Sequence, residues 1–234
     1  ESVVLVGDRD ADLVVSASLL ATARGIPALC LHEPLDAAQR EVIRQLGVKE
    51  IVTIGSNLLR PDDFAGAKLT QLEAVANVLA AYESALGEPA PEHLVVVGSG
   101  RHGQAFASSE IAPLVTQYAV HHRAAVALVD RGVGIEAQIQ KLVAERYSAV
   151  KYVTLWGDTQ SLPDEEVDDP VIAAGLETKL TDPKIAVAPL SGLIRREPSQ
   201  FRVGRITGNT WSAVSLVVAR NLRRHRNRRR LRRG

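Results

Sequence analysis

Hydrophobic and polar positions follow one another in blocks along the first part of this chain. Short apolar runs at residues 2–6, 26–31 and 50–54 are separated by segments with helical periodicity at 13–24 and 36–46. Each apolar run has the length of a buried strand, and each connection carries a helix, so the pattern predicts a parallel sheet. Glycines close the predicted helices and the third strand, at Gly25, Gly47 and Gly55.

A second block repeats this order. Apolar runs at 94–97, 124–129 and 150–156 enclose helical segments at 105–122 and 135–147. Five elements agree in order and type with the first block, which indicates an internal duplication of a β-α-β-α-β unit. The sequence therefore predicts an α/β fold with two tandem Rossmann-like or flavodoxin-like lobes, each built on a parallel sheet.

The segment between the blocks carries the predicted lobe boundary. Leu69, Leu72 and Leu79 recur at helical spacing and predict a helix from about residue 63 to Tyr82. The stretch 87–91 (GEPAP) has the composition of a linker. We expect a first lobe at 1–88, a second lobe at 92–219 and an arginine-rich tail at 220–234.

After Asp158 the duplication is expected to end. The acidic stretch 161–170 is predicted as a loop, followed by a short helix at 171–180. Further strands are predicted at 184–188 and 200–206, and a last helix from about Trp211 to Leu222, capped by Asn209 or Thr210. The second lobe thus gains an extra strand and helix at its end.

Charge is distributed unevenly. Nine of the 28 basic residues are arginines from Arg220 onward, so the first 219 residues hold 19 basic against 27 acidic groups. The tail lacks aromatic side chains for base stacking, which disfavours sequence-specific readout of nucleic acid. Its arginines suit anionic lipid, nucleic-acid phosphates or an acidic protein surface, and a solvated tail is the alternative.

Composition limits the class of protein. With 46% apolar residues the chain can bury a sizeable core, and no window approaches the roughly 18 consecutive apolar residues of a membrane helix. It shows no signal-peptide pattern, begins with Glu1 and lacks methionine, so we expect a piece of a longer polypeptide. The single cysteine, Cys30, excludes a disulfide within the chain and is expected in the core.

A glycine-rich turn is the strongest motif. Gly98, Gly100 and Gly103 follow a strand and precede a helix, and Asp130 ends the next strand. This spacing predicts a dinucleotide site, with pyrophosphate at the helix start and ribose at the acid, and NAD or an adenine nucleotide as cofactor. The corresponding turn of the first lobe, 7–10 (GDRD), is acidic and would repel phosphate. The alternative is a turn that only connects strand and helix, with no cofactor.

Metal and catalytic sites are less well supported. Asp8, Asp10 and Asp12 resemble the start of a calcium loop, but the glycine and glutamate that complete it are missing. We therefore expect Asp12 to cap the following helix, and we expect the acidic stretch 164–169 to be a solvated loop, with calcium as the alternative in both. No metal site and no catalytic residue are predicted, because the histidines and serines lack partners at recognisable spacing.

The first block resembles the cell-wall-binding type 2 repeat. That family has a strand, an Asp-containing turn, a helix that ends in Gly-x-Pro, and a second helix that closes with Leu-Gly-Val. The resemblance covers about the first 55 residues. The matching residues are Asp12, Gly25, Pro27, Leu46, Gly47, Val48 and Gly55.

The later part is similar to the non-catalytic half of gingipain-type cysteine peptidases. In that family a strand ending in Gly-Asp precedes a Leu-Pro pair, and a later Val-Gly-Arg-Ile leads to a helix. The matching residues are Gly157, Asp158, Leu162, Pro163, Val203, Gly204, Arg205 and Ile206. The family's catalytic His-Gly and Cys would follow this segment, whereas here an arginine tail follows and no cysteine occurs after Cys30.

Three functional hypotheses follow. The resemblances imply a non-catalytic, extracytoplasmic binding or scaffolding module of a cell-envelope protein or assembly, with an envelope polymer or a protein as partner. They single out Asp12, Asp158 and Arg205 as candidate ligand-binding residues. The glycine turn implies instead a nucleotide-binding regulatory domain, for which a cytoplasmic location is expected. The third hypothesis is a catalytically incomplete part of a gingipain-like peptidase.

Overall fold

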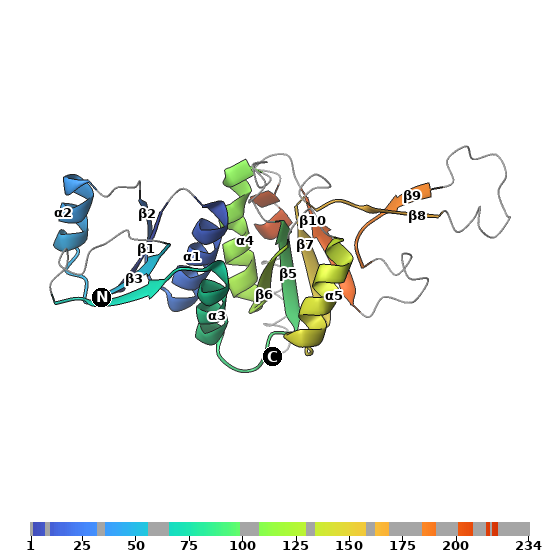
Figure 1. Cartoon of the computed structure of the whole chain (residues 1–234), viewed down its shortest axis with the longest axis horizontal. Coiled ribbons are helices and arrows are strands. Elements are labelled where there is room, and N and C mark those ends of the chain that lie inside the picture. Colours follow the sequence, from blue (N-terminus) through green and yellow to red (C-terminus); the bar gives the residue numbers. More distant parts are fainter. Residues whose placement is uncertain are drawn as a thin grey trace, which may run out of the picture.

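Two four-stranded parallel sheets and a two-stranded antiparallel ribbon make up the sheet structure of the described residues. This confirms an α/β protein with two Rossmann-like lobes (Figure 1). The structure is a computed structural model and describes residues 2–7, 10–31, 36–55, 66–98, 108–129, 134–157, 162–168, 184–190, 201–207, 214–215 and 217–219.

The first lobe has the strand order β2-β1-β3-β4. All neighbouring strands in this sheet run parallel. Its elements are β1 (Ser2–Gly7), α1 (Ala11–Arg24), β2 (Ala28–Leu31), α2 (Ala37–Gln45), β3 (Glu50–Ile54), β4 (Lys68–Leu72) and α3 (Val75–Leu86).

The ends of the first two helices follow from local chemistry. The Asp10 side chain accepts hydrogen bonds from the N–H groups of Asp12 (2.9 Å) and Leu13 (3.1 Å), so Asp10 caps α1. The expectation that Asp12 is the cap was wrong, since the cap lies two residues earlier. Gly25 ends α1 in the left-handed conformation, as predicted. Asp36 begins α2 with a capping box that it shares with Gln39.

The second lobe has the strand order β6-β5-β7-β10. Its elements are β5 (His93–Gly98), α4 (Ser108–His122), β6 (Ala125–Val129), α5 (Ile135–Glu145), β7 (Tyr152–Trp156) and β10 (Arg202–Ile206). The antiparallel ribbon consists of β8 (Glu165–Asp168) and β9 (Lys184–Val187) and extends away from the lobe (Figure 1).

The duplication continues further than predicted. Lys68 of β4 lies opposite Glu50 of β3, and Arg202 of β10 lies opposite Tyr152 of β7 in the same register. The helical residues 214–215 and 217–219 then follow β10 as α3 follows β4. The expectation that the repeat ends after Asp158 was therefore wrong. A long insertion separates β7 from β10, so the strand and helix that complete the second copy are far from the rest of it in the sequence.

Three further expectations were wrong. The helix predicted up to Tyr82 is in fact strand β4 followed by helix α3. The predicted acidic loop contains strand β8, which pairs with β9. Cys30 is exposed, because β2 is an edge strand with a partly solvated face. The helix predicted at 171–180 and the tail lie outside the described residues.

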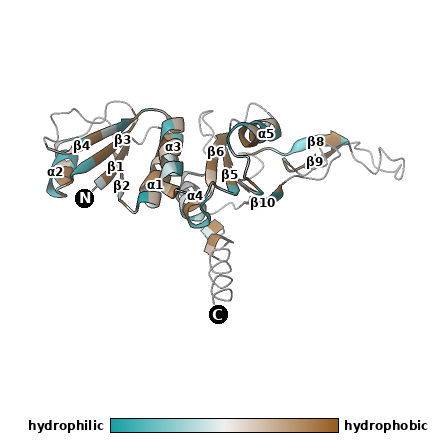
Figure 2. Ribbon diagram, turned by 90° about the horizontal axis from the view of Figure 1, so that it is seen from below, coloured by the Kyte–Doolittle hydropathy of each residue, from teal (hydrophilic) through white to brown (hydrophobic). Residues whose placement is uncertain are grey.

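Hydrophobic packing divides into an inner core and two outer ones. Alternation along β1 sends Val4 and Val6 to the inner core and Val3 and Leu5 to the outer core beneath α2. Strand β5 divides in the same way, with its outer face beneath α5. The inner core includes buried residues of both lobes, and Figure 2 shows hydrophobic strands in both sheets. One continuous core therefore joins the lobes.

Polar contacts reinforce this junction. The Tyr82 hydroxyl of α3 donates to the carbonyl of Ala124 at 2.7 Å. Glu83 accepts hydrogen bonds from Arg146 (2.8 Å) and from the Tyr147 hydroxyl (2.5 Å). Arg123, just after α4, donates to the carbonyls of residues 86–88 at the end of α3.

The three helices of the junction end on the same side of the molecule. The ends of α1 and α3 line one cavity, and Arg123 joins the end of α4 to the end of α3. Strands run opposite to the helices that connect them, so the carboxyl edges of both sheets face the other side together (Figure 1). No helix among the described residues is long and apolar enough to cross a membrane.

Candidate functional site

Each lobe reverses its strand order at its first strand, and the carboxyl edge of the second lobe, at β5, is the candidate site that the glycine motif predicts. The chain leaves β5 toward β6 on one side, and β7 lies on the other side of β5. Ligands of open α/β sheets bind in the crevice at such a reversal of strand order. Gly98 ends β5 there and is buried. Gly100, Gly103, Asp130 and Asp158 lie outside the described residues.

Arg205 lies near the end of β10 at this carboxyl edge. Its Nη2 donates to Asp164 at 2.8 Å, and its side chain is only 16% exposed. Its Nε and Nη1 are buried and find no hydrogen-bond partner among the residues that the structure describes. Buried donors that lack acceptors carry a desolvation penalty, which an anionic or carbonyl group would relieve.

The structure also brings together the two stretches that carry the peptidase resemblance. β10 pairs with β7 along its whole length, and Gly157 donates its N–H to the Ile206 carbonyl at 3.0 Å. The Arg205–Asp164 ion pair then ties β10 to the segment that contains buried Leu162. Strands about 50 positions apart in the sequence, such as Tyr152 opposite Arg202, thus lie side by side in the sheet.

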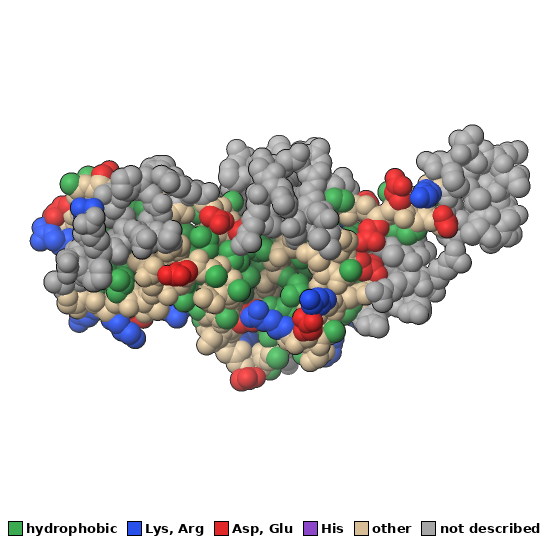
Figure 3. Space-filling view, viewed as in Figure 1, with side chains coloured by type: hydrophobic (Ala, Val, Ile, Leu, Met, Phe, Trp, Pro, Cys, Tyr) green, Lys and Arg blue, Asp and Glu red, His purple; other side chains and the backbone are tan. Residues whose placement is uncertain are grey.

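The acidic side chains at the start of α5 already accept hydrogen bonds from the protein. Buried Glu136 accepts hydrogen bonds from the N–H of Leu190 (2.9 Å) and from the Gln140 amide (3.0 Å). Glu165 of the acidic stretch accepts from the N–H of Glu136 at 3.3 Å. The described residues contain no group of three His, Cys, Asp or Glu placed to hold a metal ion. Acidic side chains over β8 are visible in Figure 3.

Asp12 lies in a groove between the lobes. It is 2% exposed in the first turn of α1. The groove has a cavity of about 330 Å³. It is lined by Asp12, by α3, by the edge strand β6 and by α5 with Tyr147. Figure 3 shows hydrophobic side chains on this face of the molecule.

Tyr147 is held at the groove in its neutral form. Burial raises the pKa of the Tyr147 phenol, and its hydrogen bond to Glu83 raises the pKa further. The phenol therefore acts there as a hydrogen-bond donor. The groove brings Asp12 near groups that the sequence analysis did not single out, and Arg205 is not among its lining residues.

A ring cluster inside the second lobe was missed by the sequence analysis. His93 accepts or donates a hydrogen bond at 2.8 Å with the Thr154 hydroxyl, which also contacts the Tyr118 hydroxyl at 3.2 Å. Rings of Tyr118, His122 and Tyr152 pack around His93 with centroid distances of 5.6–6.3 Å, and the rings of Tyr118 and His122 lie 4.5 Å apart. Burial lowers the pKa of His93 to about 4, so its ring is neutral at pH 7. Alternation along β5, which puts His93 on the face of Val95, is the signal that could have found it.

No protein-family model matches the chain, and no curated protein matches it.

Proposed function

We propose that this chain is a non-catalytic binding and scaffolding module of a cell-envelope assembly, and that the carboxyl edge of its second lobe holds an anionic group of the partner polymer. The observation that carries this proposal is Arg205. The Asp164 carboxylate orients the guanidinium, and its buried Nε and Nη1, which lack a partner among the described residues, are left to bind an anion. The envelope location rests on the resemblance of the first lobe to wall-binding repeats.

The junction between the lobes supports a scaffolding role. A shared inner core and the bonds of Tyr82, Glu83 and Arg123 hold the two sheets together. Both carboxyl edges face one side, so a long polymer could contact both lobes at once. A rigid arrangement lowers the ordering cost of such an extended contact.

Retention of the full chain on purified envelope polymers tests this proposal. We expect retention at low salt and at moderate salt, and a loss of about tenfold or more in the Arg205→Gln variant. Arg202→Gln is the matched control, because Arg202 is exposed at the opposite end of the same strand. Equal retention of both variants, or no retention of the unaltered chain at either salt concentration, contradicts the proposal.

A nucleotide-binding regulatory domain is the second candidate. It is favoured by buried Gly98, which ends β5 at the reversal of strand order. Thermal unfolding with NAD, NADP, ATP and AMP distinguishes the two candidates. A nucleotide at 100 times its dissociation constant should add about 2.7 kcal/mol of stability. If none of the four raises the unfolding temperature, this candidate fails while the first is untouched.

A further inference from the structure

The amino edges of the two sheets correspond to each other in the duplication, but different side chains occupy them. Ser2 lies opposite Glu50 in the first lobe, and His93 lies opposite Tyr152 in the second. The helices that follow the first strands, α1 and α4, also end alike. Gly25 and Arg123 both have positive φ, and the backbone N–H of each donates to the carbonyl of the third residue before it. Arg24 therefore corresponds to His122.

Aromatic side chains fill this position in the second lobe. His93, His122 and Tyr152 pack there together with Tyr118 of α4. The first lobe has Ser2, Arg24 and Glu50 at the three equivalent positions, and no ring replaces them. A cavity of about 560 Å³ lies there instead, between the starts of β1 and β3 and the ends of α1 and α3.

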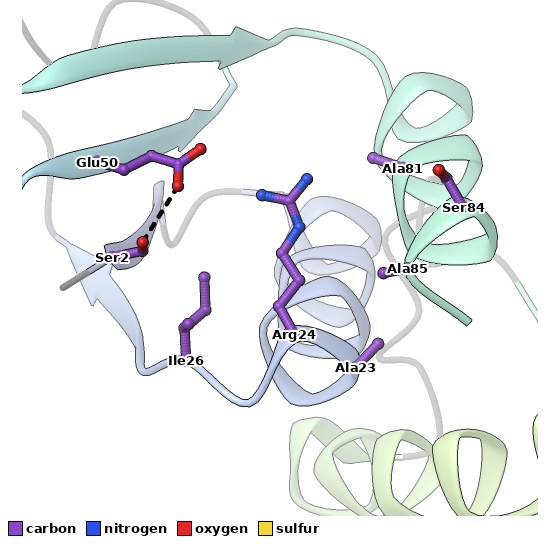
Figure 4. A pocket seen from close by; sticks show the side chains of 8 residues that line it. All are labelled: Ser2, Ala23, Arg24, Ile26, Glu50, Ala81, Ser84 and Ala85. Atoms are coloured by element: carbon purple, nitrogen blue, oxygen red, sulfur yellow. Dashed lines mark hydrogen bonds between the residues drawn. The ribbon is translucent and has the colours of Figure 1, made fainter. Parts of the chain in front are cut away.

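Two opposite charges face this cavity. The Glu50 carboxylate accepts a hydrogen bond from the Ser2 hydroxyl at 3.1 Å, which orients it. The Arg24 guanidinium points into the cavity from the end of α1 (Figure 4). Among the residues drawn there, no hydrogen bond joins Arg24 to Glu50. The two charged groups are therefore free to bind different parts of one ligand.

The remaining walls suit the uncharged part of such a ligand. Ile26 lies beneath the two charges, and three alanines come from the ends of α1 and α3, namely Ala23, Ala81 and Ala85 (Figure 4). Ser84 adds one hydroxyl. The carbonyl ends of both helices carry partial negative charge, which favours a cation in the cavity beside Glu50. The volume falls in the range of small-molecule sites.

We propose that this cavity binds a small zwitterion of the amino-acid type, with its ammonium group at Glu50 and its carboxylate at Arg24. Arginine pairs with a carboxylate through two parallel N–H groups, and a carboxylate accepts from an ammonium ion. The site lies on the amino edge of the first sheet, opposite the carboxyl edges, so it is separate from the polymer site proposed above.

Calorimetric titration of the full chain tests this site. The probes are glycine, β-alanine, γ-aminobutyrate and ε-aminohexanoate, which differ in the distance between ammonium and carboxylate. We expect one member to bind best, and its N-acetylated and carboxamide forms to bind about tenfold or more weakly, because each lacks one charge. If blocking neither group weakens binding, or if no member of the series binds, the proposal is overturned.

Variants locate the binding. Glu50→Gln and Arg24→Gln should each weaken the best probe about tenfold, and Ala81→Leu should abolish binding by filling the cavity. Glu41→Gln is the control, since Glu41 forms an exposed ion pair with Arg44 on α2. Thermal unfolding checks that each variant is folded, and Glu50→Asp, which keeps the charge, should retain part of the affinity. Unchanged binding in both charge variants rejects the site.

Discussion

His93 links the stability of the second lobe to pH. The groups that face it are Thr154, Tyr118, His122 and Tyr152, and none of them is an acid. Burial lowers its pKa to about 4 from an ordinary value of 6.5. The unfolded chain therefore binds this proton more readily than the folded one between those two values, and stability falls as pH drops from about 6.5 to about 4.

Urea unfolding at pH 7, 5 and 4 measures this effect. A pKa difference of this size corresponds to about 3 kcal/mol lost at the acid end. The His93→Gln variant keeps a polar side chain opposite Thr154 but cannot titrate, so its unfolding free energy should fall less over the same range. Parallel pH curves for the two proteins would contradict the assignment.

At the scale of single elements, the stability of the end of α1 depends on the left-handed backbone conformation of Gly25 and not on space for a side chain. Gly25 has φ 67°, and a Cβ placed on it would meet no atom within 4 Å. Gly25→Ala should therefore cost about 1 kcal/mol from the left-handed conformation without any clash. Urea unfolding measures it, with Ala23→Gly in the same turn as a comparison for helix propensity. No loss of stability in Gly25→Ala would show that the helix end rearranges easily.

The elements that the sequence predicted well are those buried on both faces. Strands such as β1 and β5 appear as unbroken apolar runs because helices cover both sides of each sheet. Strand β4 was missed because Lys68, Thr70 and Gln71 interrupt its apolar pattern. Its Leu69 and Leu72 also continue the helical spacing of α3. Strand β8 was missed because acidic residues disfavour strands except at exposed edges.

The candidate sites were predicted only where they depend on local sequence. Gly98 became a candidate because the glycine-rich turn is a continuous stretch of sequence. Arg205 became a candidate because it belongs to the Val-Gly-Arg-Ile segment. The cavity of Arg24 and Glu50 depends on strand register and on how two helices end, so no local pattern reveals it. The same holds for the contact of His93 with Thr154, 61 residues away.

At the scale of the whole molecule, the shared core predicts that the lobes unfold together. Leu20 of α1 is fully buried in the inner core, and Trp156 of the second lobe is buried in the same core. Leu20→Ala should cost roughly 2 to 5 kcal/mol and should shift the tryptophan fluorescence transition although the change is in the first lobe. Leu46→Ala, at an exposed leucine, is the control. A fluorescence midpoint that does not move, with a separate transition in circular dichroism, would show independent lobes.

The packing of α1 against α4 joins two copies of the same element. Such a contact between equivalent surfaces is the kind that identical subunits form around a twofold axis. One lobe by itself would expose the apolar side of its first helix, so its stability would depend on association with a second copy, hence on concentration. Joining the copies through residues 87–92 makes that association intramolecular. The two joined copies can therefore differ locally. Aromatic rings occupy the amino edge of the second sheet, and a cavity occupies the same position in the first.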